Sequence, residues 1–99
     1  VKLDKLDHVA VQVQDIESGV KWYTETFDCE VVYTDKTWAL LNFENIRLAL
    51  VKPDQHPNHF AVERSDARAF GELTKHRDGT KTVYINDPWE NIIEILKAD

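Results

Sequence analysis

The alternation of apolar and polar residues near the start of the chain predicts a β-strand. From Leu6 to Val13 the sequence reads LDHVAVQV, and its valines recur with the two-residue period of a strand that buries one face. After Asp15 the period changes, because apolar residues at positions 16, 20, 23 and 27 have helical spacing. Aspartate is a preferred N-cap, so we expect a helix that begins directly after Asp15.

The next stretch, residues 29–51, is rich in β-branched and aromatic residues and is divided by two polar breaks. These breaks, at positions 35–36 and 44–45, have the composition of turns. The pattern therefore predicts three antiparallel strands, at Glu30–Thr34, Thr37–Phe43 and Ile46–Lys52. Together with the first strand and helix, they make a β-α-β-β-β module.

The opening pattern returns after a polar linker at residues 52–58. The segment HVAVQVQD at 8–15 aligns with HFAVERSD at 59–66. Each copy has a histidine early in a strand and an aspartate at the expected N-cap, which indicates duplicated modules. We therefore expect a second helix after Asp66. Its inward-facing residues would be Ala67, Phe70, Leu73 and Thr74.

The second copy has room for fewer strands than the first. A tight turn at Arg77–Thr80 precedes expected strands at Lys81–Asn86 and Asn91–Lys97. The second module is then β-α-β-β, with its outer strand missing or vestigial, since an edge strand is paired on one side only. The expected fold is α+β, with paired modules at residues 5–52 and 58–97 of a single domain spanning 1–99.

The composition is that of an ordinary globular domain. Of the 99 residues, 42% are hydrophobic and 30% are charged, and no apolar run reaches the roughly 20 residues that cross a bilayer. The formal net charge of −6 disfavours nucleic acid as a partner, because phosphate backbones require basic patches. A single cysteine, Cys29, does not call for an oxidising compartment. We therefore expect a cytoplasmic protein that binds neither nucleic acid nor membranes.

Four segments together resemble the vicinal-oxygen-chelate superfamily, which includes glyoxalases, bleomycin-resistance proteins and extradiol dioxygenases. They are DHVAVQV, DIESGVKWYTETF, NHFAVE and NDPWENIIEIL. The last is similar to the family signature D-P-x-G-N-x-x-E, although Glu90 stands where the signature has glycine. The signature positions present are Asp87, Pro88, Asn91 and Glu94. The resemblance implies paired βαβββ modules that form a half-open cup around a divalent metal ion.

The same resemblance implies His8, His59 and Glu94 as the metal ligands, with Glu94 also the catalytic residue. Two imidazoles and one carboxylate leave open positions on Fe(II), Mn(II), Ni(II) or Zn(II), and a metal there can polarise two adjacent oxygens of a small molecule. Aligning the module ends places Ala49 opposite Glu94, so a fourth protein ligand is absent. This departs from glyoxalase I and is closer to extradiol dioxygenases and fosfomycin-modifying transferases.

Other residues and other readings stay open at this point. Possible pocket residues are Trp38, Arg47, Tyr84 and Trp89, whereas His56 and His76 are expected at the surface. The histidine pair could be a relic of duplication, and Glu94 could be a solvated strand carboxylate. The function expected first is a metal-dependent enzyme acting on a small oxygenated molecule, as a homodimer. The alternatives are a metal-free binding protein of the bleomycin-resistance type and a degenerate dimeric scaffold.

Overall fold

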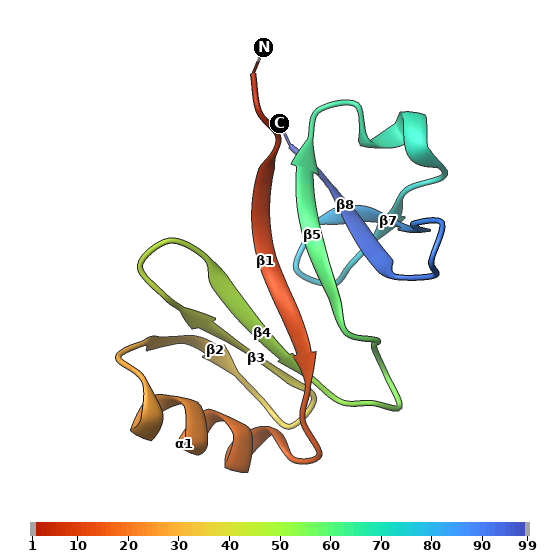
Figure 1. Ribbon diagram of the computed structural model, residues 1–99. Helices are drawn as coiled ribbons and strands as arrows, with labels where there is room; N and C mark the ends of the chain where they lie inside the picture. Colours follow the sequence, from red (N-terminus) through yellow and green to blue (C-terminus); the bar gives the residue numbers. More distant parts are fainter. Residues whose placement is uncertain (1, 99) are drawn as a thin grey trace. The chain divides into compact units, whose positions relative to one another are not determined.

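Strand β1 (Lys5–Gln12) is shared between the two units into which the chain folds. The computed structural model describes residues 2–98 and is drawn in Figure 1. One unit runs from His8 to Asn58, and the other joins the segment up to Asp7 to the segment from His59 onward. Among residues 2–98, no helix is both long and apolar enough to cross a membrane.

The unit from His8 to Asn58 has the β-α-β-β-β order of elements that the sequence predicts for residues 5–52. Its strand order is β2-β3-β4-β1, in which β1 and β4 are parallel and the other neighbours are antiparallel. The predicted elements are confirmed, with ends that differ by a residue or two at most. After β1 their bounds are α1 (Ile16–Thr26), β2 (Glu30–Thr34), β3 (Trp38–Asn42) and β4 (Arg47–Val51).

Helix α1 begins where the sequence predicts, because Asp15 caps it. The Asp15 carboxylate accepts hydrogen bonds from the Ser18 backbone N–H at 2.9 Å and from the Ser18 hydroxyl at 2.7 Å, which satisfies a donor that the first turn leaves unpaired. The helix lies against one face of its unit's sheet (Figure 1). The core between helix and sheet is built on Ile16, Ala39, Leu41 and Leu50.

The opposite face of the same sheet carries a smaller apolar cluster of Ala10, Leu40, Ala49 and Val51. Because side chains alternate along a strand, every second residue of β1, β3 and β4 belongs to this face. His8 lies on it, two residues before Ala10 on β1. The larger core therefore lies on the α1 side of the sheet, and the opposite face combines a small apolar cluster with the polar side chain of His8.

The second unit repeats this arrangement in shortened form. Its strand order, β5-β8-β7-β6, again pairs the first and last strands in parallel. The segment up to Asp7 belongs to this unit and is held to β5 by two ion pairs. Arg64 pairs with Asp4 at 2.8 Å, and Glu63 pairs with Lys5 at 3.6 Å. The elements are β5 (His59–Arg64), a 3₁₀ turn (Ala67–Phe70), β6 (Thr74–Lys75), β7 (Lys81–Asn86) and β8 (Ile92–Lys97). The α+β class and the abbreviated second module are confirmed.

The second helix predicted after Asp66 is wrong, since only the four-residue 3₁₀ turn forms there. Asp66 makes no capping hydrogen bond; its carboxylate instead binds the Arg64 guanidinium at 2.7 and 3.2 Å. Phe70, expected to face inward, is 38% exposed beneath that guanidinium. Thr74, also expected on the helix, lies in β6, the vestigial outer strand.

Candidate metal centre

A histidine and a glutamate on neighbouring strands of the second unit project from the same face of its sheet. Strands β5 and β8 run parallel, with His59 beside Ile92 and Ala61 beside Glu94. Residues two apart on a strand share a face, so His59 and Glu94 are diagonal neighbours on one side.

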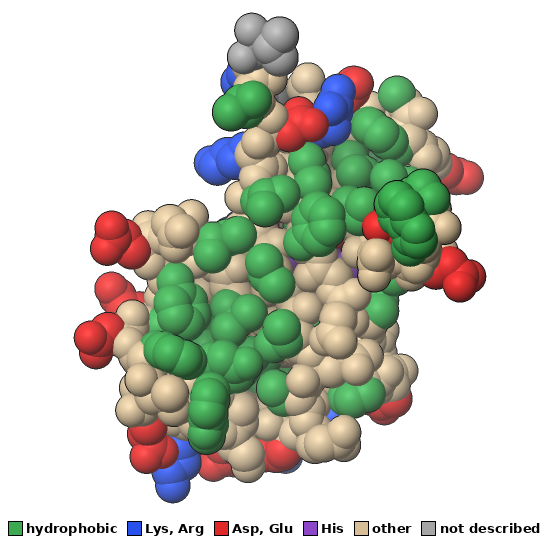
Figure 2. Space-filling model, in the orientation of Figure 1, with side chains coloured by type: hydrophobic (Ala, Val, Ile, Leu, Met, Phe, Trp, Pro, Cys, Tyr) green, Lys and Arg blue, Asp and Glu red, His purple; other side chains and the backbone are tan. Residues whose placement is uncertain are grey.

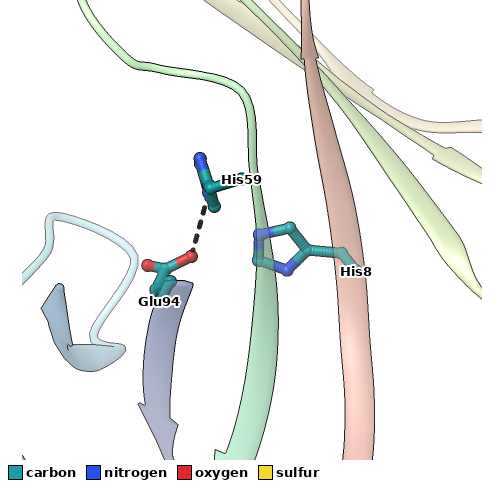
Figure 3. Close-up of side chains that lie close together, drawn as sticks. All are labelled: His8, His59 and Glu94. Carbon is teal, nitrogen blue, oxygen red and sulfur yellow. Dashed lines mark ion pairs between the residues drawn. The ribbon is translucent and has the colours of Figure 1, made fainter. Parts of the chain in front are cut away.

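The two side chains form a buried pair. His59 Nε2 lies 3.3 Å from Glu94 Oε1 (Figure 3), and the two residues are only 8% and 6% exposed. Removing a carboxylate from water costs several kcal/mol unless polar partners compensate for the lost hydration. The reading of Glu94 as a solvated strand carboxylate is therefore wrong, because the residue is buried among polar groups.

Tyr84 is the third member of this group. It is the register partner of Glu94 on β7, and its hydroxyl hydrogen-bonds the Glu94 side chain. The Tyr84 ring meets the His59 ring edge to face, with centroids 5.6 Å apart. Burial, and then the negative charge of Glu94, raise the pKa of Tyr84 well above its ordinary value. The phenol therefore stays protonated and available as a donor.

His76 is a fourth member, which the sequence did not suggest. It was expected at the surface, but the structure places its half-buried ring beside the other oxygen of the carboxylate, with Nε2 3.9 Å from Glu94 Oε2. The same nitrogen lies 2.7 Å from the Thr82 hydroxyl. His76 follows the vestigial strand β6, so no hydrophobic period marks its position, and only the β6–β7 pairing brings it to this face.

The counterpart of this site in the other unit lacks a carboxylate. There the parallel pair β1 and β4 sets His8 beside Arg47 and Ala10 beside Ala49. In register terms, His8 corresponds to His59 and Ala49 to Glu94. Figure 3 also draws His8, which projects from β1. Ala49 is buried and has no ligand atom, which agrees with the alignment of module ends.

The four possible pocket residues fall in different places. Arg47 and Trp38 share a face of their own unit with His8, since Arg47 pairs with His8 and Trp38 pairs with Val51. The Trp38 ring is half-buried and packs on Tyr33, with centroids 5.0 Å apart. Tyr84 lies against Glu94, as described above. Trp89 lies outside both sheets, on the β7–β8 turn, and is 79% exposed.

The β7–β8 turn contains the signature residues and shows why a glycine belongs there. The Asp87 carboxylate accepts hydrogen bonds from the backbone N–H groups of Trp89 and Asn91 and from the Asn91 side-chain amide, each at 2.9 Å. Glu90, which occupies the glycine position, has φ of 68°. This left-handed conformation is unfavourable for a residue with a Cβ atom. The turn leads directly into β8 and so positions Glu94.

Comparisons with known proteins agree with this architecture. The family model for the "Glyoxalase/Bleomycin resistance protein/Dioxygenase superfamily" matches residues 5–71. No curated protein sequence matches the chain significantly.

Several solved structures resemble the fold at low sequence identity. A hypothetical protein from Bacillus halodurans has a TM-score of 0.77 at 15% identity, over 99% of this chain and 96% of that one. A methylmalonyl-CoA epimerase in complex with methylmalonyl-CoA and NH4+ has a TM-score of 0.76 at 16% identity, over 98% and 96% of the two chains. A superfamily member from Vibrio splendidus has a TM-score of 0.68 at 11% identity, over 97% and 100%.

The solved structures establish the fold, and the family model establishes the relationship, since it matches more than half of the sequence. The matched region contains β1, β5 and both histidines of the strand repeat. The chain belongs to the glyoxalase/bleomycin resistance protein/dioxygenase superfamily.

Proposed function

We propose that this protein is a metal-dependent enzyme whose divalent ion, held by His8, His59 and Glu94, chelates two adjacent oxygens of a small molecule. The observation that carries the proposal is the buried pair of His59 and Glu94, with ligand atoms 3.3 Å apart. A buried carboxylate beside an imidazole is costly for folding and useful for binding a cation.

The donors present fit such an ion. Two ligand atoms that each lie about 2.1 Å from one metal at a right angle are about 3 Å apart, close to the separation of His59 Nε2 and Glu94 Oε1. Imidazole and carboxylate together suit Fe(II), Mn(II), Ni(II) or Zn(II). Tyr84 hydrogen-bonds the carboxylate, which is the kind of outer contact that orients a metal ligand.

His8 is proposed as the second imidazole because it is the register equivalent of His59 in the duplicated strand pattern. With Ala49 in the position equivalent to Glu94, the set ends at three protein ligands. Three ligands leave positions for two substrate oxygens.

When bound, the ion would act as a Lewis acid toward those oxygens. The chain's own residues would bind and orient the substrate around it. Arg47, beside His8 on β4, would pair with an anionic group of the substrate. Tyr84, whose phenol keeps its proton, would donate a hydrogen bond at the other side, and Glu94 would be the carboxylate nearest the reacting atoms. The superfamily uses this arrangement for several reactions, and the fold alone does not choose among them.

A metal titration tests the proposal. Calorimetry of the chelator-treated protein with Mn(II), Ni(II) and Zn(II) should give saturable binding at one ion per chain. Substitution of any proposed ligand, as in His8→Ala, His59→Ala or Glu94→Ala, should weaken it by at least about 100-fold. His56→Ala is the matched control and should bind like the wild type. Absence of binding by folded wild-type protein would refute the enzyme proposal.

A second candidate is a metal-free protein that binds a small aromatic or cationic molecule. The observation in its favour is the exposed indole of Trp89, which offers a stacking surface. The two candidates differ in whether ligand binding depends on His8, His59 and Glu94. A sequestering protein would bind its ligand equally well with Glu94→Ala, and a ligand-induced change in tryptophan fluorescence would disappear with Trp89→Ala.

We further propose that residues 5–52 and 58–97 act as paired modules of one domain and that two copies associate. Every residue of the edge strand β2 is exposed, and apolar side chains gather over the unit that contains it (Figure 2). An open edge with apolar side chains favours pairing with another chain. Light scattering should give a dimer mass for the wild type and a monomer mass for Val32→Lys; a monomeric wild type would contradict the association.

A further inference from the structure

The two oxygens of the Glu94 carboxylate have different neighbours. Oε1 lies 3.3 Å from Nε2 of His59. Oε2 lies 3.9 Å from Nε2 of His76, which is too long for a direct hydrogen bond but close enough for the imidazole to occupy the space beside that oxygen. The carboxylate therefore sits between two rings that come from opposite directions along the sheet.

His76 is held in place independently of Glu94. Its Nε2 lies 2.7 Å from the hydroxyl of Thr82, a residue that is 1% exposed. Its backbone N–H donates to the Thr80 carbonyl at 2.7 Å, and its carbonyl accepts from Gly79 at 2.9 Å. The Asp78 carboxylate closes the same turn by accepting from the Thr80 backbone N–H and hydroxyl at 3.0 and 2.6 Å. The ring is thus anchored by a complete hairpin.

We propose that His76 is a positioning residue that acts through Glu94. It blocks rotation of the carboxylate toward the outer strand and keeps Oε1 on the side of His59, so that Oε1 is the oxygen offered to a metal ion. This inference rests on the proposed function, because it takes Glu94 as a metal ligand. Outer contacts that fix a ligand's orientation usually change metal affinity by about 10–100-fold when removed.

A comparison of the two units supports the assignment. In the unit from His8 to Asn58, the position equivalent to Glu94 is Ala49, and the turn before β3 contains Asp35 and Thr37, which hydrogen-bond each other. A histidine in this hairpin therefore occurs in the unit that has the carboxylate, whereas the equivalent hairpin of the other unit has Asp35 and Thr37. A role confined to closing a hairpin would not require a histidine at this point.

The test is Mn(II) binding by calorimetry to the full chain, with the metal alone as probe. We expect His76→Ala to weaken binding by about 10–100-fold. His76→Gln, whose amide nitrogen can take the place of Nε2, should recover most of that loss. Thr82→Val, which removes the anchoring hydroxyl without changing side-chain shape, should weaken binding in the same direction. His56→Ala is the matched control and should leave affinity unchanged.

A double-mutant cycle separates positioning from a general structural effect. If His76 acts through Glu94, adding His76→Ala to Glu94→Gln should change the Mn(II) affinity by less than about twofold. The visible absorption of bound Co(II) should differ between the wild type and His76→Ala and be restored in His76→Gln. Equal Mn(II) affinity in wild type and His76→Ala, or additive effects in the cycle, overturns the assignment of His76 alone. Absence of binding by the wild type overturns the proposed function and this inference together.

Discussion

Glu90→Gly should stabilise the protein, although it removes a side chain and adds flexibility. Glu90 lies in the turn between β7 and β8 with φ of 68°, a conformation that costs an L-residue about 1–2 kcal/mol. Glycine removes this cost but loses about 0.4–1 kcal/mol through the greater entropy of the unfolded chain. The difference between these two ranges is a gain of about 0–1.6 kcal/mol, centred near 0.8 kcal/mol, which corresponds to a rise in melting temperature of roughly 3–6 °C for a domain of this size.

The measurement is urea unfolding of the wild type, Glu90→Gly and Glu90→Gln, with thermal melts alongside. The Glu90→Gln control keeps the Cβ atom and removes the charge, and the chain already carries a formal net charge of −6. If strain in the backbone is the cause, glycine raises the free energy of unfolding, and glutamine leaves it within about 0.5 kcal/mol of the wild-type value. An equal rise in both variants would assign the effect to charge, and a fall in Glu90→Gly would refute the reasoning.

Three further predictions concern stability. Leu50→Ala removes a fully buried side chain between α1 and the sheet and should lower the free energy of unfolding by about 2–5 kcal/mol in urea; a loss below 1 kcal/mol would contradict the assigned core. Hydrogen bonds from the Asn91 side chain and backbone lower the pKa of Asp87. The contribution of Asp87 to the free energy of unfolding is therefore present above about pH 4 and is lost as the pH falls. Asp87→Ala should flatten the acid side of the plot of unfolding free energy against pH, with exposed Asp54→Ala as the control. Burial raises the pKa of Tyr84. The contribution of Tyr84 to the free energy of unfolding is therefore present below about pH 10 and is lost as the pH rises. The fall of the urea midpoint at alkaline pH should be smaller in Tyr84→Phe than in the wild type.

The strands could be predicted well because their patterns are local. Glu30–Thr34 and Lys81–Asn86 match the structure to the residue, since β-branched and aromatic residues fill the interior of each strand and a polar break follows it. The duplication also placed Ala49 opposite Glu94 in advance, and the two parallel registers confirm it. Asp15 was likewise recognisable as a cap, and its carboxylate bonds Ser18 in the first turn of α1.

The second helix and the position of His76 were predicted wrongly, because each depends on a partner that the local sequence pattern does not reveal. Asp66 resembles Asp15 in sequence, but Arg64 takes its carboxylate and the helix does not form. His76 carries no period and reaches Glu94 only through the pairing of β6 with β7. Its role could not be separated from that of an ordinary surface histidine without the fold.

The division of β1 between the two units has a consequence for the order in which the protein folds. The unit from His8 to Asn58 is continuous in sequence, so all of its contacts can form once Asn58 has left the ribosome. The other unit is discontinuous: Arg64 binds Asp4 across 60 residues, and β5 pairs with β8, the last described strand in chain order. Non-local contacts of this kind form late. We therefore expect the buried pair of His59 and Glu94 to form after the unit from His8 to Asn58 has folded.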